Sequence, residues 1–164
     1  MCGIVGYAGH RDALPLLAEG LSNLEYRGYD SAGVALCADD LTVYKTVGEV
    51  DALRATLPDA SGATVGIGHT RWSTHGKPTD ENAHPHTDCT GDVAVVHNGI
   101  IDNYDALKEE LEAAGHTFAS QTDTEVVPHL VEDELADGKS AKKAFEAVIE
   151  RLEGSFALAM VVDD

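Results

Sequence analysis

The spacing of apolar positions in the first third of the chain predicts a strand followed by a helix. The short apolar run 2–8, which contains glycines, predicts a buried strand. Pro15 fits only the first turn of the helix that follows, because proline has no backbone N–H. The helix is predicted from leucines at the 3-4-3 spacing of one amphipathic face: Leu14, Leu17, Leu21 and Leu24.

The middle of the chain predicts further strands and a long polar connection. Residues 32–37 and 41–47 are expected to form a hairpin turning at Asp39 and Asp40. A short helix is predicted at 49–57, and Val- and Ile-rich strands at 64–69 and 92–98. The segment 70–91 between these strands is rich in His, Thr, Pro, Asp and Gly, and a loop of that length in a compact domain is usually functional or disordered.

The last third predicts helices before a final strand. Asp102 or Asn103 is expected to cap a helix that ends at Gly115. Thr122 and Glu125 match a capping box in front of another helix. A helix at 140–152 and a strand at 154–162 follow. Mixed helices and hairpin-like strands predict a layered α/β or α+β domain.

The charge balance changes which partners are expected. The chain has 164 residues, with 29 Asp and Glu against 11 Lys and Arg, and a formal charge of −18. Clustered cations are needed to bind phosphate, so nucleic acid and anionic lipid are poor partners. An even acidic coat is typical of proteins from a very salty cytoplasm, where salt screens self-repulsion; the alternative is an ordinary acidic protein. No signal sequence and no membrane-spanning run is visible, which favours a cytoplasmic protein.

Cys2 is the candidate nucleophile. Removal of Met1 would leave a thiol and an α-amine on the same carbon, and the amine could take the thiol proton and return it to a leaving group. The alternative is a buried cysteine that happens to follow Met1. Three widely spaced cysteines favour neither disulfides nor a zinc ribbon. Cys37 is interpreted as a small core residue, and Cys89 has no evident role.

Other segments offer groups that could bind a substrate. Asn98 and Gly99 could donate N–H groups to an oxyanion, although Asn-Gly after a strand is also a common turn. Arg71, beside Trp72, could bind the carboxylate of a substrate; alternatively, it could form a surface ion pair with an acidic residue of the chain. Asp123 could bind an ammonium group or simply favour a helix N-terminus. Arginine and aspartate together would suit an α-amino acid.

Histidines in and around the polar connection raise the alternative of a metal-binding protein. No carboxylate or thiol completes a familiar ligand pattern near them, so we expect neither a metal nor a cofactor. The histidines in question are His69, His75, His84, His86 and His97.

Several motifs, taken in order, resemble the glutaminase domain of the glutamine–fructose-6-phosphate aminotransferases (isomerising), also called glucosamine-6-phosphate synthases. These are class II glutamine amidotransferases of the N-terminal-nucleophile hydrolase type. The resemblance runs from residue 2 to the end of the chain. It is carried by the segments 2–6, 24–33, 69–76, 82–86, 97–101 and 122–125.

The resemblance implies a four-layer α-β-β-α sandwich and a role for each matching residue. Cys2 would attack the side-chain amide of L-glutamine with its own α-amine as base, while Asn98 and Gly99 form the oxyanion hole. Arg71 would hold the α-carboxylate and Asp123 the α-ammonium. The remaining implied substrate contacts are Trp72, Thr74 and His75 on a closing loop, His84 near the site, and Arg27 beside the N-terminus.

The resemblance also implies a larger protein. Family members continue beyond residue 164 into isomerase domains that bind fructose 6-phosphate and convert it to glucosamine 6-phosphate, and a full-length homodimer is possible. Residues 1–164 are therefore expected to be an incomplete glutaminase domain with the isomerase domains absent. The alternatives are an amidophosphoribosyltransferase-like glutaminase and a catalytically idle glutamine-binding module.

Overall fold

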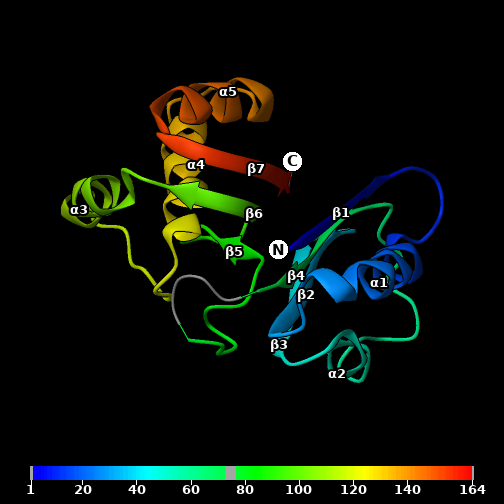
Figure 1. Cartoon of the computed structure of the whole chain (residues 1–164). Coiled ribbons are helices and arrows are strands. Elements are labelled where there is room, and N and C mark those ends of the chain that lie inside the picture. The colour runs from blue at the N-terminus through cyan, green and yellow to red at the C-terminus, as the bar shows by residue number, and fades with distance from the viewer. Residues whose placement is uncertain (1, 73–76, 164) are drawn as a thin grey trace.

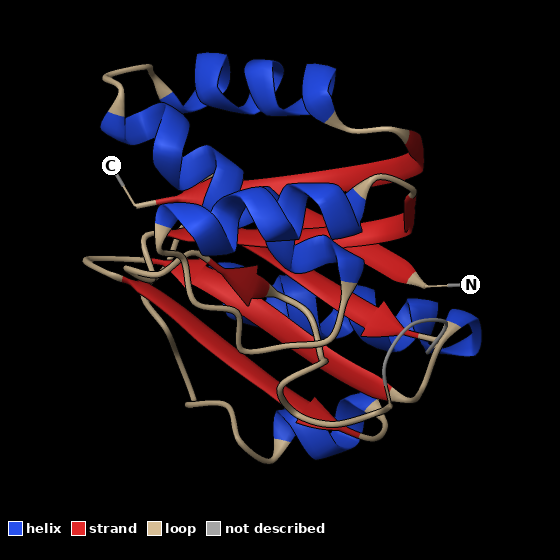
Figure 2. Cartoon of the chain, turned by 90° about the vertical axis from the view of Figure 1, so that its left-hand side faces the viewer, coloured by secondary structure: helices blue, strands red, loops and turns tan. Residues whose placement is uncertain are grey.

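The computed structural model describes residues 2–72 and 77–163, and these form four layers (Figure 1). Two antiparallel sheets lie face to face in the middle, and helices cover the outer face of each. Figure 2 shows the same arrangement from the side, with helices in front of and behind the strands. The α+β four-layer sandwich expected from the sequence is confirmed.

The first sheet has the strand order β1-β4-β2-β3. Its strands are β1 (Gly3–Ala8), β2 (Ser31–Cys37), β3 (Leu41–Val47) and β4 (Val65–Arg71). Helix α1 (Ala13–Leu24) packs on β1 and β4, and helix α2 (Val50–Arg54) lies beside it. The segment η1 (Glu25–Arg27), which directly follows α1 in the chain, is a turn of 3-10 helix. The leucine stripe of α1 supplies the apolar layer between helix and sheet, since Leu14, Leu17 and Leu21 are all buried.

The second sheet has the order β5-β6-β7. Its strands are β5 (His86–Thr87), β6 (Val93–Ile101) and β7 (Gly154–Val162). Its outer face is covered by α3 (Tyr104–Ala114), the 3-10 turn η2 (Asp123–Glu125), α4 (Val126–Ala136) and α5 (Ala141–Arg151). This half contains the largest apolar cluster, in which Val93 and Val95 of β6 pack against Leu130 of α4.

The two sheets meet through small apolar side chains. Ala35 and Ile67 of the first sheet pack against Ala94, Val96 and Val161 of the second. Short side chains allow the sheets to approach closely. Cys37, predicted to be a small core residue, packs against this cluster but is only partly buried. At the rim of this interface the two sheets bring polar side chains together.

The helix ends agree with the sequence in part. Gly115 ends α3 in the left-handed conformation, with φ of 106°, which confirms its predicted role. Asn103 stands at the N-terminus of α3, but its side chain does not cap the helix. Its amide instead donates to the carbonyl of Arg151 and its oxygen accepts from the N–H of Glu153.

The predicted capping box at Thr122 and Glu125 is wrong. Thr122 makes no capping hydrogen bond, and its hydroxyl lies 3.0 Å from His86 Nε2. The carboxylate of Glu125 accepts backbone N–H groups from Ala119 and Ser120, 2.7 Å away in each case. The buried carboxylate therefore organises the turn ahead of the helix.

Candidate active site

A pocket of about 360 Å³ opens at the rim where the two sheets meet, and it gathers most of the predicted site residues. Its volume falls in the range of about 300–1,000 Å³ that is usual for small-molecule sites. The predicted residues that line it come from the ends of the strands, from the residues next to them, from η1 and η2, and from the segment before β5: Cys2, Arg27, Arg71, Trp72, His84, Asn98, Gly99 and Asp123. Thr74 and His75 lie outside the described residues.

Cys2 lies directly before β1, and hydrogen bonds from Trp72, which follows β4, and from Asn98 of β6 hold it there. The backbone N–H of Trp72 donates to Cys2 Sγ at 3.2 Å, and the side-chain amide of Asn98 donates to the carbonyl of Cys2 at 3.1 Å. The sulfur is partly exposed, so a ligand in the pocket can reach it. These contacts fix the thiol beside the predicted oxyanion donors.

The orientation of the Asn98 side chain is set by His69. Nε2 of His69 lies 2.9 Å from Asn98 Oδ1 and 3.0 Å from the carbonyl oxygen of His97. Both partners only accept, so Nε2 carries the hydrogen. The amide oxygen of Asn98 therefore turns toward His69 and its nitrogen toward Cys2, with a second hydrogen for a ligand.

Gly99 must be glycine for two reasons. Its φ of 128° lies in the left-handed region, and a Cβ there would come within 2.0 Å of the carbonyl oxygen of Ser155 on β7. Gly28 is required by close approach alone, because a Cβ there would lie 2.7 Å from the carbonyl carbon of Arg71. The turn at Gly28 thus brings Arg27 against the end of β4.

Arg71 and Asp123 place opposite charges in the pocket wall. Arg71 is only 4% exposed and Asp123 only 5%. Burial lowers the pKa of Arg71, while negative charge at Cys2, Asp30 and Asp123 acts in the opposite direction. Asp123 Oδ2 accepts the backbone N–H of Ile101 at 2.9 Å, which fixes the carboxylate relative to β6.

Trp72 and His84 form other parts of the wall. Trp72 is 45% exposed, and its ring meets the edge of Tyr29 with centroids 5.6 Å apart. His84 is buried below, and its Nε2 lies 2.9 Å from the hydroxyl of Thr124, which also lies 2.8 Å from His97 Nδ1. Thr124 was not singled out from the sequence, because a threonine in a helix-initiating segment gives no chemical signal.

A layer of histidines lies beneath the pocket, between the sheets. The rings of His69 and His84 are 4.2 Å apart, and those of His84 and His86 are 4.7 Å apart. The sequence suggested the alternative that these histidines bind a metal. Among residues 2–72 and 77–163, the side chains that lie close enough together to hold an ion form a different group, which does not include them. Burial lowers the pKa of His69 to about 4 and those of His84 and His86 well below the ordinary value, so the rings are neutral at pH 7.

These neutral histidines should make the fold sensitive to acid. Unfolded, His69 has an ordinary pKa of 6.5, so between pH 6.5 and about 4 the unfolded chain binds a proton that the folded chain does not. Stability is therefore lost as the pH falls through this window, by about 2 kcal/mol from His69 alone at about pH 5. His84 and His86 act in the same direction.

Urea unfolding at neutral and mildly acidic pH measures this effect. The midpoint should fall clearly on acidification, and the variant His10→Gln should show the same fall, because His10 is exposed. Equal midpoints at the two pH values would contradict the buried, neutral state of the histidine layer.

Comparison with known proteins now gives the family. A family model described as the glutamine amidotransferase domain matches residues 69–164, which is more than half of the chain. This chain belongs to the glutamine amidotransferase domain family. The matched range contains Arg71, Asn98, Gly99 and Asp123, so the family model covers most of the predicted site residues that line the pocket.

Relatives of this glutamine amidotransferase domain carry a more specific name. A glutamine–fructose-6-phosphate aminotransferase (isomerising) of Halobacterium salinarum is 63% identical over 98% of this chain and 26% of its own length. The enzyme of the same name from Symbiobacterium thermophilum is 56% identical over 98% and 26%. The chain thus spans about a quarter of the length of these curated relatives.

Solved structures share the fold of this amidotransferase domain. The glutamine phosphoribosylpyrophosphate amidotransferase from B. subtilis, complexed with ADP and GMP, has a TM-score of 0.83 and 27% identity. It aligns with 99% of this chain and 35% of its own. These matches confirm the N-terminal-nucleophile sandwich. In the part of the chain that the structure describes, no helix is long and apolar enough to cross a membrane.

Proposed function

We propose that this domain hydrolyses the side-chain amide of L-glutamine to glutamate and ammonia through a thioester on Cys2. The observation that supports this proposal most is the convergence of the Cys2 thiol and the Asn98 amide in a pocket that also holds Arg71 and Asp123. A nucleophile, an oxyanion donor and two opposite charges are what amide hydrolysis of a free amino acid requires.

The two charged walls would select the substrate. The guanidinium of Arg71 can bind the α-carboxylate through two hydrogen bonds. Asp123 Oδ1 is the candidate acceptor for the α-ammonium, because Oδ2 already accepts from Ile101. Arg27 adds positive charge near the carboxylate, and Trp72 with His84 would shape the walls. Thr74 and His75, which follow Trp72 in the sequence, are proposed to add further contacts to the substrate.

The reaction uses the chain's own terminus once Met1 has been removed. The α-amine of Cys2 takes the thiol proton, and the sulfur bonds to the amide carbon of glutamine. The Asn98 amide and the Gly99 N–H stabilise the oxyanion. The proton then passes to the departing nitrogen, the C–N bond breaks and ammonia is released. The glutamyl group stays bound to the Cys2 sulfur as a thioester. Water adds to the thioester, so that glutamate leaves and the thiol is restored.

In the full-length protein, the ammonia would be used to make glucosamine 6-phosphate from fructose 6-phosphate. Support comes from relatives whose name gives fructose 6-phosphate as the substrate of an aminotransferase. The isomerase domains that the resemblance implies would lie outside residues 1–164. Identities of 56–63% with these relatives, against 27% with the phosphoribosyl amidotransferase structure, favour this role over the amidophosphoribosyltransferase alternative. A cytoplasmic location, a homodimer and a salt-adapted surface stay predictions.

Covalent labelling tests the proposal. An electrophilic glutamine analogue should add to Cys2 in one equivalent, and the adduct should appear on the N-terminal peptide by mass spectrometry. Excess glutamate should slow the labelling by competing for Arg71 and Asp123. Adducts confined to Cys37 or Cys89 would refute the proposed nucleophile.

Intact mass separates the enzyme from an idle glutamine-binding module. Loss of Met1 frees the amine that the mechanism needs. A protein that retains Met1 but still binds glutamate would favour the binding module.

A further inference from the structure

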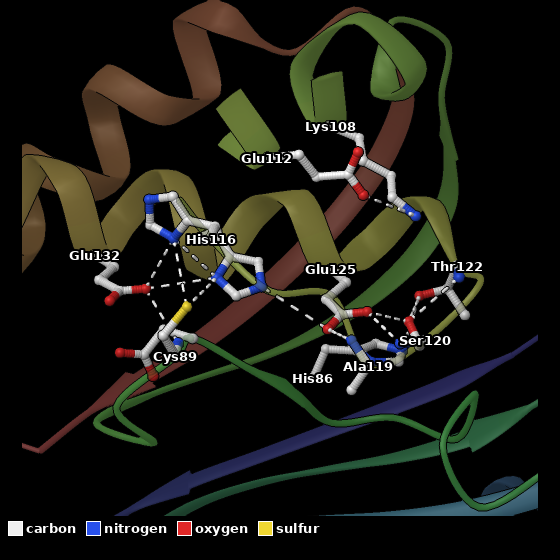
Figure 3. A network of polar contacts seen from close by, with 12 residues as sticks. His86, Cys89, Lys108, Glu112, His116, Ala119, Ser120, Thr122, Glu125 and Glu132 are labelled. Atoms are coloured by element: carbon white, nitrogen blue, oxygen red, sulfur yellow. Dashed lines mark hydrogen bonds and ion pairs between the residues drawn. The ribbon is translucent and has the colours of Figure 1, made fainter. Parts of the chain in front are cut away.

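A second cluster of reactive side chains lies outside the pocket, on the helical face of the second sheet. Cys89 belongs to the β5–β6 loop, His116 follows the end of α3, and His129 and Glu132 lie one turn apart on α4. Figure 3 shows Cys89, His116 and Glu132 pointing toward one another. None of these residues lines the pocket around Cys2.

The atoms that face one another are a sulfur, two ring nitrogens and a carboxylate oxygen. Cys89 Sγ lies 3.6 Å from His116 Nδ1 and 3.5 Å from His129 Nδ1. The two Nδ1 atoms are 3.3 Å apart. Glu132 Oε2 lies 3.3 Å from His116 Nδ1 and 3.5 Å from His129 Nδ1. All four atoms lie within 4.8 Å of one another.

The N···N and S···N separations match edges of a tetrahedron around zinc. With Zn–N bonds of about 2.05 Å and a Zn–S bond of about 2.3 Å, a regular tetrahedron has N···N edges of about 3.3 Å and S···N edges of about 3.6 Å. The observed N···N and S···N distances agree with these values within about 0.1 Å.

The outer side of the His116 imidazole ring supports the same conclusion. His116 Nε2 lies 2.9 Å from Asp133 Oδ1, and because a carboxylate only accepts, this nitrogen carries the hydrogen. His129 Nε2 lies 3.8 Å from Glu125 Oε1, which is beyond hydrogen-bond distance, so only His116 has this hydrogen bond. Histidines that bind metals usually donate their other ring N–H to a carboxylate in this way. When Nε2 carries the only ring hydrogen of His116, its Nδ1 lone pair faces His129, Cys89 and Glu132.

We propose that Cys89, His116, His129 and Glu132 bind one divalent transition-metal ion, with zinc as the best match. Thiolate and imidazole ligands favour zinc over magnesium or calcium. Four protein ligands close the coordination sphere, which is typical of a structural site. Cys89 is exposed, so an ion can enter from solvent, and the Cys89 thiol releases its proton to solvent as the S–Zn bond forms.

Such an ion would join three segments that are far apart in the sequence. It would tie the β5–β6 loop to the end of α3 and to the first half of α4. Helix α4 follows directly from η2, which carries Asp123 of the pocket. The proposal concerns stability and does not depend on glutamine hydrolysis.

A competing explanation needs no metal. If His116 carried two protons, its Nδ1–H could donate to Glu132, His129 or Cys89, and the cluster would be a hydrogen-bond network around an imidazolium. The two explanations differ in whether an ion is bound in stoichiometric amount and whether the sulfur is its ligand.

Metal analysis and cobalt substitution test the proposal. The untagged protein, purified without chelator, should contain close to one zinc per chain by elemental analysis. After removal of zinc, Co²⁺ should give visible bands of tetrahedral cobalt and a near-ultraviolet thiolate-to-cobalt band. Cys89→Ser should lose the thiolate band and His116→Gln should weaken binding at least tenfold.

Two matched controls locate the ion. Cys37→Ser should keep the thiolate band, because Cys37 lies in the interface between the sheets. Cys2→Ala should also keep it, which excludes chelation by the N-terminal amine and thiol. No stoichiometric zinc and no cobalt band, or a band that disappears only in Cys2→Ala, would overturn the proposal.

A further measurement covers the case in which Cys89→Ser does not fold. Zinc should slow the alkylation of Cys89 in the wild-type chain at least tenfold while leaving Cys37 unaffected, as read from peptide masses. Equal alkylation rates of Cys89 with and without zinc would also count against the site.

Discussion

Replacing Cys2 by alanine should lower glutamine hydrolysis by about 10⁴-fold or more, because the proposed nucleophile is removed and none of the other described residues lining the pocket carries a thiol. Alanine is as small as cysteine at this position, so removal of Met1 should be unaffected. The backbone carbonyl of Cys2 remains to accept the hydrogen bond from Asn98. Ammonia release in a coupled assay measures the loss.

The same variant separates catalysis from binding. Arg71 and Asp123 are unchanged in Cys2→Ala, so titration calorimetry should still detect glutamate with an affinity within a few fold of wild type. Cys37→Ser is the matched control for thiol loss and should retain full activity, since Cys37 packs between the sheets. Activity that survives in Cys2→Ala would show that another group performs the reaction.

Replacing Asn98 by aspartate should lower kcat by about 10²–10³-fold with little change in KM, which is the effect of losing one oxyanion donor. The substitution keeps the shape of the side chain and an oxygen for His69, which lies 2.9 Å from Asn98 Oδ1. It replaces the donor that faces Cys2 by an acceptor, so an oxyanion would meet a negative charge.

Steady-state kinetics and a surface control test this expectation. Asn23→Asp adds the same charge on an exposed position of α1 and should leave both constants unchanged. If Asn98→Asp raised KM and left kcat intact, Asn98 would bind the ground state and the proposed oxyanion role would be wrong.

The fold could be predicted largely from local patterns. The leucine stripe of α1 and the left-handed glycine at Gly115 are both encoded by neighbouring residues. The predicted strand at 154–162 coincides with β7. Apolar periodicity was reliable here because each helix or strand buries one face against a neighbouring layer.

Tertiary contacts explain where local patterns were insufficient. Thr122 and Glu125 have the spacing of a capping box, but neither side chain caps the helix. The Thr122 hydroxyl contacts His86 instead, and the Glu125 carboxylate accepts the backbone N–H groups of Ala119 and Ser120. The layer around His69 could not be predicted, because a histidine in a strand has no spacing that reveals which groups lie across the interface.

The two clusters differ in how visible they are in the sequence. Residue chemistry could pair Arg71 with Asp123 as an amino-acid site, but only the resemblance could join this pair to Cys2 and Asn98, since the four residues share no local spacing. The cluster at Cys89 joins three separate segments and escaped prediction for the same reason. Only the i, i+3 pair His129 and Glu132 is local, and such pairs are common on helices.

The pocket spans the interface between the two sheets, with Cys2 and Arg71 on one side and Asn98 and Gly99 on the other. The apolar contact between these sheets consists mainly of short side chains. An amino acid bound in this pocket would contact both sheets at once and would reversibly hold them together at their interface. Substrate occupancy and the docking of the two halves are then thermodynamically linked, and each strengthens the other.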